Sequence, residues 1–137
     1  SYSITPGVSS FQAAAAVLKT QYTIPGDTQT VILTRANGRT AVLEREQLRE
    51  LARSRSTMCI FLSASLAQQV EQELLTHYPA DTPVALCHAV TWPQEQVVIC
   101  TLSELASEMR RCGFTQHTLI VVGQAVGGAL VSLLPGE

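Results

Sequence analysis

The sequence is poor in aromatic and charged side chains. Aromatic residues make up 5% and charged residues 15% of its 137 residues, whereas hydrophobic residues make up 46%. Aliphatic side chains must therefore fill the core, and a chain of this length can bury one domain-sized core. The composition excludes a disordered or low-complexity chain. The formal net charge of -2 argues against a nucleic-acid-binding protein, because such proteins depend on a basic face.

Long apolar runs and targeting patterns are also lacking. No apolar run approaches the roughly 20 residues needed to cross a bilayer, so no membrane association is expected. No signal-peptide pattern opens the sequence, and a cytoplasmic location is the default expectation. The cysteines form no C-x-x-C pair and have no H-x-x-x-H partner, which favours buried free thiols over zinc binding or disulfides. The four are Cys59, Cys87, Cys100 and Cys112.

Apolar runs and turn signals alternate along the chain in an order typical of an α/β sheet flanked by helices. The predicted strands cover 30–35, 57–63, 82–90, 95–101 and 118–123, with a possible last strand at 129–134. A first helix is predicted from the capping box of Ser9 and Gln12, and further helices cover 43–54, 65–78 and 102–112. Only a short connection separates the third and fourth strands, so a hairpin there predicts a mixed sheet.

Turn and cap residues mark the ends of these elements. Thr101 and Glu104 form a T-x-x-E capping box, and Gly113 stands where the following helix should stop. Asn37-Gly38 is a strong turn signal. Residues 25–27, Pro-Gly-Asp, break any regular element and are the candidate domain boundary.

Ligands in such sheets bind at the carboxyl ends of strands, which directs attention to the loops after Leu62, Val90 and Val122. The sequence "GQAVGG" at 123–128 favours a plain turn over a phosphate cradle, because it lacks the G-K-[ST] of a P-loop.

Arginines at four-residue spacing predict one basic helix face, formed by Arg45, Arg49 and Arg53. Neighbouring glutamates favour a solvated face, and a site for a polyanionic ligand is the alternative. Arg35 and Arg39, at a strand end and a turn, suit such a site better than the helix does.

Motifs for acid–base or nucleophilic catalysis are not apparent. His77, His88 and His117 are scattered, and no serine, cysteine or acid stands at triad spacing. We therefore predict no catalytic side chain and no metal site, and expect any reaction to depend on positioning a reactive cofactor.

Four segments resemble successive blocks of the tetrapyrrole methylase family. They are "PGVSSFQAAAAVL", "TQTVILTRANGRT", "STMCIFLSASL" and "DTPVALCHAVTWPQEQVV", and the resemblance runs in order from Pro6 to about Gly123. "TQTVILTR" with "GRT" and "TWP-x-E" is most similar to the branch that methylates C11 of precorrin-4 or cobalt-precorrin-4 in cobalamin biosynthesis. Alternatives are another methylase of the family, such as a uroporphyrinogen-III methylase, and a non-catalytic α/β interaction domain.

The resemblance implies a two-domain protein with S-adenosylmethionine bound between two α/β domains. The G-x-G-P-G-D segment and the G-D-P loop of the first domain are not in this sequence. Residues 1–24 then correspond to the last helix of the N-terminal domain plus a linker, and 25–137 to the C-terminal α/β domain. The implied partners are the tetrapyrrole substrate, the N-terminal domain of the same protein and a second copy in a homodimer.

The family match also implies site residues. Ser9 and Ser10, after "PGV", take the place of a cofactor-contacting pair, and Leu62 and Val90 match positions beside the cofactor. Arg35 and Arg39 are the predicted contacts for the carboxylates of the substrate.

A last expectation concerns the first helix. Its apolar face, formed by Phe11, Ala14, Ala15 and Leu18, should lack the sheet of the first domain. The helix should then be mobile, displaced or buried against a second copy, and the chain should fold without catalysing.

Overall fold

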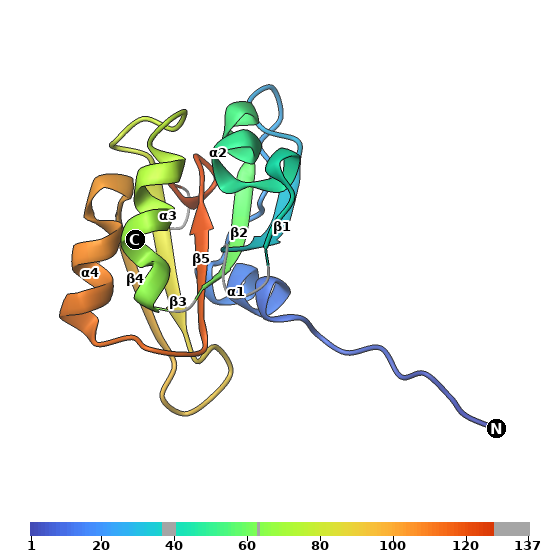
Figure 1. The fold of residues 1–137 in the computed structure, drawn as a ribbon. Coiled ribbons are helices and arrows are strands. Elements are labelled where there is room, and N and C mark those ends of the chain that lie inside the picture. The colour runs from blue at the N-terminus through green and yellow to red at the C-terminus, as the bar shows by residue number, and fades with distance from the viewer. Residues whose placement is uncertain (37–40, 63, 128–137) are drawn as a thin grey trace.

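A five-stranded mixed sheet forms the centre of the molecule (Figure 1). The structure is a computed structural model that describes residues 1–36, 41–62 and 64–127. The strands lie in the order β1-β2-β5-β3-β4. Their bounds are β1 (Val31–Arg35), β2 (Thr57–Leu62), β3 (Pro83–His88), β4 (Gln96–Thr101) and β5 (Thr118–Val122). Only β1 and β2 pair in parallel within this sheet, and β3 and β4 form the predicted hairpin, so the mixed α/β sheet is confirmed.

Helices cover the two faces of the sheet unequally (Figure 1). Their bounds are α1 (Ser10–Leu18), α2 (Leu48–Leu51), α3 (Ala67–Leu74) and α4 (Leu105–Cys112). Short 3-10 turns lie at Glu44–Glu46, Ala52–Ser54, Ala64–Leu66 and Leu102–Glu104. Helices α2, α3 and α4 pack on one face, which we call the three-helix face. Helix α1 packs on the other, which we call the α1 face.

The two faces hold separate clusters of buried side chains. Alternate residues of a strand point to opposite faces, so neighbours in β2 divide between the clusters. Met58 and Ile60 belong to the three-helix face, together with Val70 and Leu74 of α3. Cys59 belongs to the α1 face. The other members of that cluster are Ala14, Leu18, Tyr22, Ala85, Cys87, Leu119, Val121 and Val126.

Local chemistry sets the predicted helix ends. Ser9 is the N-cap of α1, and its backbone N–H donates to Gln12 Oε1 at 3.3 Å in the capping box. Thr101 and Glu104 form the second box, ahead of α4. Gly113 ends α4 with a φ of 68°, a conformation that glycine adopts without the steric cost of a Cβ.

The predicted helix over 43–54 is not continuous. Gln47 has extended backbone angles, φ -68° and ψ 150°, and becomes the N-cap of α2 instead of a helical residue. Arg45 therefore lies before the break, and the predicted single face of Arg45, Arg49 and Arg53 is wrong. Arg53 instead pairs with Glu50 on the surface at 3.7 Å.

The expectation for α1 is also wrong. Ala14 and Leu18 are fully buried against the sheet of this chain, so the helix has a sheet to pack on. Hydrogen bonds also hold the residues after α1 against the rest of the chain. Tyr22 Oη donates to the carbonyl of Phe11 at 2.6 Å, and Thr20 Oγ1 donates to the carbonyl of Ala125 at 2.9 Å. Within residues 20–30, Tyr22 and Thr28 are buried, and a bridge between Ile24 and Thr28 closes a turn.

The four cysteines are free. Cys59 and Cys87 are buried as predicted, whereas Cys100 and Cys112 are partly exposed. Over the described ranges, no helix is long and apolar enough to cross a bilayer, and no cluster of histidine, cysteine and acidic residues is suited to a metal ion. The Asn37-Gly38 turn and the possible strand at 129–134 lie outside the described residues.

Candidate functional site

A cavity of about 390 Å³ opens where β2 and β3 end and β5 begins. Both β2 and β3 pair antiparallel to β5, so their carboxyl ends and the start of β5 meet at one end of the sheet. Helix α1 contributes its first residue to the same place. The lining residues are Ser10, Phe61, Leu62, Cys87, Ala89, Val90, Trp92, His117, Thr118 and Leu119.

The direction of β5 corrects one prediction. Val122 lies opposite Met58 and Val84, near the starts of β2 and β3. The loop after Val122 is therefore at the opposite end of the sheet from the loops after Leu62 and Val90. In "GQAVGG", Gly123 adopts a φ of 139° and passes close to Thr57, so the described part of this segment is a tight turn away from the cavity.

Three of the predicted cofactor residues come together in the cavity. Ser10, Leu62 and Val90 arrive from α1, β2 and the loop after β3 and line the same space. Ser9 is the cap of α1 and is not among the lining residues. Their roles toward a cofactor stay predictions.

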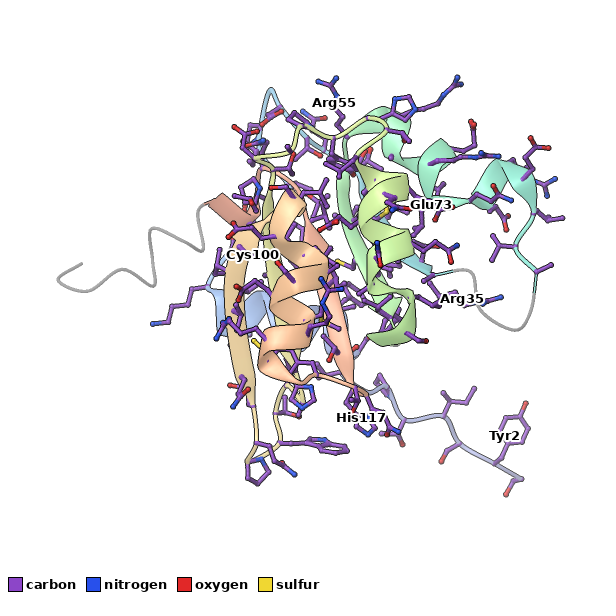
Figure 2. All side chains as sticks on the ribbon, turned by 60° about the vertical axis from the view of Figure 1, so that its left-hand side comes forward. Tyr2, Arg35, Arg55, Glu73, Cys100 and His117 are labelled. Carbon is purple, nitrogen blue, oxygen red and sulfur yellow. The ribbon has the colours of Figure 1, made fainter. Side chains whose placement is uncertain are left out.

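The predicted substrate residues lie elsewhere. Arg35 ends β1, an edge strand, and points outward there (Figure 2). It lies opposite Phe61 in the β1–β2 register, and Phe61 lines the cavity. Arg35 also borders a second hollow of about 470 Å³ along β1, together with Leu33 and Leu43. Arg39 lies outside the described residues.

The connection after β3 and the start of β5 form one wall of the cavity with an uncommon backbone. Ala89, Thr91 and His117 have positive φ angles of 49°, 73° and 55°. Such angles cost a residue other than glycine about 1–3 kcal/mol and persist where the surrounding structure enforces them. Two backbone hydrogen bonds do so here, from the N–H of Ala89 to the carbonyl of His117 at 2.9 Å and from that of Trp92 to the carbonyl of Ala89 at 3.0 Å.

Side chains fix the same wall. The backbone N–H of Thr91 donates to Glu95 Oε1 at 2.8 Å. The ring of His88 stacks on that of Phe114 with centroids 4.4 Å apart, and its Nδ1 lies 3.1 Å from Thr118 Oγ1. These contacts join the end of β3 to the start of β5.

Two aromatic rings of this wall face each other. The indole of Trp92 lies 4.8 Å from the His117 ring at an angle of 45°, and Trp92 is 50% exposed. Figure 2 shows His117 at the end of the sheet where the extended N-terminal residues leave the body. The sequence alone does not single out either residue, since His117 is one of three scattered histidines and Trp92 stands out only within the "TWP" block.

The cavity is apolar and uncharged in character. Its described lining residues include no carboxylate, lysine or arginine side chain. Burial raises the pKa of the Cys87 thiol to about 12, so this group is a neutral, unreactive thiol at neutral pH. Such a lining suits a neutral, partly aromatic ligand group and offers no charged acid–base pair.

Comparisons with known proteins place the sequence of this chain in a family. The family model of tetrapyrrole (corrin/porphyrin) methylases matches residues 1–106. A cobalt-precorrin-4 C(11)-methyltransferase of Methanocaldococcus jannaschii is 44% identical over 124 residues, 90% of this chain and 48% of its own length. A precorrin-4 C(11)-methyltransferase of Pseudomonas aeruginosa is 40% identical over 125 residues, covering 91% of this chain and 50% of its own.

A solved structure has the same fold. It is described as a cobalt precorrin-4 methyltransferase, a cobalamin biosynthetic enzyme, and it matches with a TM-score of 0.87 and 43% identity. The match covers 90% of this chain and 52% of that one. The chain thus spans about half the length of the curated relatives it matches.

Proposed function

The chain belongs to the tetrapyrrole methylase family, and from this premise we propose that it is part of an S-adenosylmethionine-dependent methyltransferase acting on C11 of precorrin-4 or cobalt-precorrin-4 in cobalamin biosynthesis. The observation that carries the proposal is the joint placement of Ser10, Leu62 and Val90 in one cavity, in a chain 44% identical to a C11-methyltransferase.

The residues of the cavity fit the proposed cosubstrate. S-adenosylmethionine carries an aromatic purine, a ribose and an aliphatic chain, and the lining offers aromatic, hydroxyl and aliphatic groups to match. When bound, this molecule would supply the methyl group of its sulfonium to an electron-rich ring carbon by in-line displacement, so that the S–CH3 bond breaks as the C–CH3 bond forms and S-adenosylhomocysteine leaves.

This chain then acts by binding and orienting. The hydroxyl of Ser10 and the free N–H groups at the start of α1 hold a polar edge of the ligand. Leu62 and Val90 enclose its apolar part and exclude water from it. Alignment of two reactants contributes up to roughly 7–11 kcal/mol in favourable cases, which is consistent with a lining without an acid–base pair.

The substrate contact is proposed on the β1 side of the cavity. A tetrapyrrole of this pathway carries several carboxylates, and guanidinium groups bind carboxylates bidentately. Arg35 is in register with Phe61, which is 42% exposed and lies between Arg35 and the cavity. A flat ring placed on Phe61 brings a carboxylate toward Arg35, and Arg39 is proposed as a second contact.

We propose that a preceding α/β domain completes the site. The relatives are about twice as long as the part that this chain matches. Residues 1–24 are the proposed junction with that domain and 25–137 the second domain, although α1 packs on the sheet of this chain. A ligand that loses half of its contacts still pays most of the entropic cost of being immobilised. The 137-residue chain alone should therefore bind the cosubstrate several powers of ten more weakly than the intact protein does.

A labelled-methyl assay tests the proposal. The intact protein, given S-adenosylmethionine with a ¹³C-methyl group and precorrin-4 or cobalt-precorrin-4, should place the label on C11 in a carbon NMR spectrum. Label on another carbon would indicate another methylase of the family. A chain with no transfer to any tetrapyrrole and no cosubstrate binding would be an interaction domain.

A further inference from the structure

We infer that Trp92 and His117 form the adenine-binding wall of the cavity, with the half-exposed indole lying against the face of the purine ring. The inference rests on the proposed function for the identity of the ligand. Its own basis is the pair of facing rings and the strained backbone that carries them.

The first step is the shape of the wall. The indole and imidazole rings lie 4.8 Å apart by centroid, from positions 25 residues apart in the chain. A planar aromatic heterocycle gains most from a second planar ring placed against it, and base–aromatic stacking depends little on hydrogen-bond pattern. Because Trp92 is 50% exposed while it lines the cavity, part of the indole is open to a ligand there.

The second step is strain. Ala89, Thr91 and His117 hold positive φ angles on either side of the indole, and Thr91 is β-branched, which makes its angle a genuine outlier. The hydrogen bond from Thr91 N–H to Glu95 Oε1 and the one from Ala89 N–H to the carbonyl of His117 hold this arrangement. Residues held in this way cluster at ligand clamps.

The third step is charge, which decides which end of the cosubstrate lies here. The described lining has no cationic or anionic side chain to pair with an amino-acid carboxylate or ammonium group. Burying either group without a partner is costly, whereas an adenine is neutral. The adenosine end therefore belongs against Trp92, and the methionine end must point out of the cavity.

Charge also directs the tetrapyrrole away from the wall formed by Trp92 and His117. A tetrapyrrole with several carboxylates would need cationic partners, and Arg35 lies outside this cavity on the edge strand. The wall is therefore specific for the cosubstrate, and its substitution should leave tetrapyrrole binding intact.

Calorimetry of the intact protein with S-adenosylhomocysteine tests the wall with two substitutions. Trp92→Phe keeps an aromatic face and should hold the dissociation constant within about twofold. Trp92→Ala should raise it about fivefold or more. Tyr2→Ala, which removes an aromatic side chain that is 90% exposed, is the matched control and should have no effect.

A second readout locates the contact. Trp92 is the only tryptophan of this chain, so the ¹⁵N-labelled 137-residue chain gives one indole N–H signal. Millimolar adenosine should shift this signal together with the amide signals of Ser10 and Leu62, and methionine should not.

The outcomes separate the two proposals. Equal affinities of the wild type, Trp92→Phe and Trp92→Ala for S-adenosylhomocysteine would overturn the adenine wall and leave the proposed function standing. A shift of the Ser10 and Leu62 amides with a silent indole would do the same. An intact protein that does not bind S-adenosylhomocysteine at all would overturn the proposed function and the wall with it.

Discussion

The two faces of the sheet differ in how completely they are covered, and neighbouring residues of β2 show the contrast. Ile60 points to the three-helix face and is fully buried, whereas Phe61 points to the α1 face and is 42% exposed. Leu33 of β1, on the α1 face as well, is 48% exposed. Phe61 lines the candidate cavity, whereas Leu33 borders the second hollow along β1. The molecule thus has one face that is closely covered by helices and one that is partly exposed.

The largest effect should come from the three-helix face. Ile60→Ala removes a fully buried side chain between the sheet and its helices and should lower the free energy of unfolding by about 2–5 kcal/mol. Phe61→Ala, one residue away on the other face, is the matched control and should cost less than about 1 kcal/mol because much of the ring is already in water. Urea unfolding of both variants measures the difference in stability between the two faces. Equal losses of unfolding free energy in the two variants would contradict this difference.

Helix α1 should contribute less than the three-helix face but should still be part of the folded body. Leu18→Ala removes a fully buried side chain and should cost about 2–3 kcal/mol, at the lower end for such changes because α1 is the only helix on its face in the described residues. The partly buried Val17 is the control, and Val17→Ala should cost less. If Leu18→Ala leaves the free energy of unfolding in urea unchanged, α1 is detached from the sheet.

Local sequence was sufficient to predict most elements of the fold. The apolar run of β2 and the capping boxes at Ser9 and Thr101 depend on residues that are close in the chain, and all three are found as predicted. The break at Gln47 was missed because the leucine spacing around it fits one continuous helix.

Long-range pairing explains what could not be predicted. The direction of β5 depends on its partners β2 and β3, which lie 30 or more residues away, so the loop after Val122 was assigned to the wrong end of the sheet. The same pairing brings His117 to Trp92. Positive φ angles at Ala89 and Thr91 carry no sequence signal, because neither residue is glycine.

Buried thiols give an effect on stability that depends on pH. Burial raises the pKa of Cys87, on the α1 face, from 9.0 to about 12. Between these values the thiol ionises in the unfolded chain and stays protonated in the folded one. The unfolded state then binds fewer protons, so stability is lost as the pH rises from about 9 to about 12, by up to ~1.4 kcal/mol per pH unit.

Urea unfolding at several alkaline pH values measures this slope. Cys87→Ala should flatten it. Cys100, on the three-helix face of the edge strand β4, also has its pKa raised to about 12, chiefly by burial. It is partly exposed, so water reduces the effect and Cys100→Ala should flatten the slope less. Equal slopes in the wild type and Cys87→Ala would show that the Cys87 thiol is not shielded from water.

The smallest effects should separate stability from binding within α1 itself. Ser9 is the N-cap of this helix, and Ser10, the next residue, lines the cavity. Loss of a serine cap costs about 1 kcal/mol of stability. Loss of a hydrogen bond to a ligand weakens binding by a similar amount, roughly fivefold in the dissociation constant. Ser9→Ala should therefore lower the free energy of unfolding and leave the affinity of the intact protein for S-adenosylhomocysteine unchanged.

Ser10→Ala should do the reverse, because its hydroxyl is not the cap and alanine is the best helix former. Urea unfolding and calorimetry on the same two variants give both quantities, so each substitution serves as the control for the other. The family resemblance predicts cofactor contacts for both serines, and a loss of affinity in Ser9→Ala as well would support that wider prediction. A loss of affinity in neither variant would remove the start of α1 from the site and leave the cavity to the wall formed by the β3–β4 connection and the start of β5.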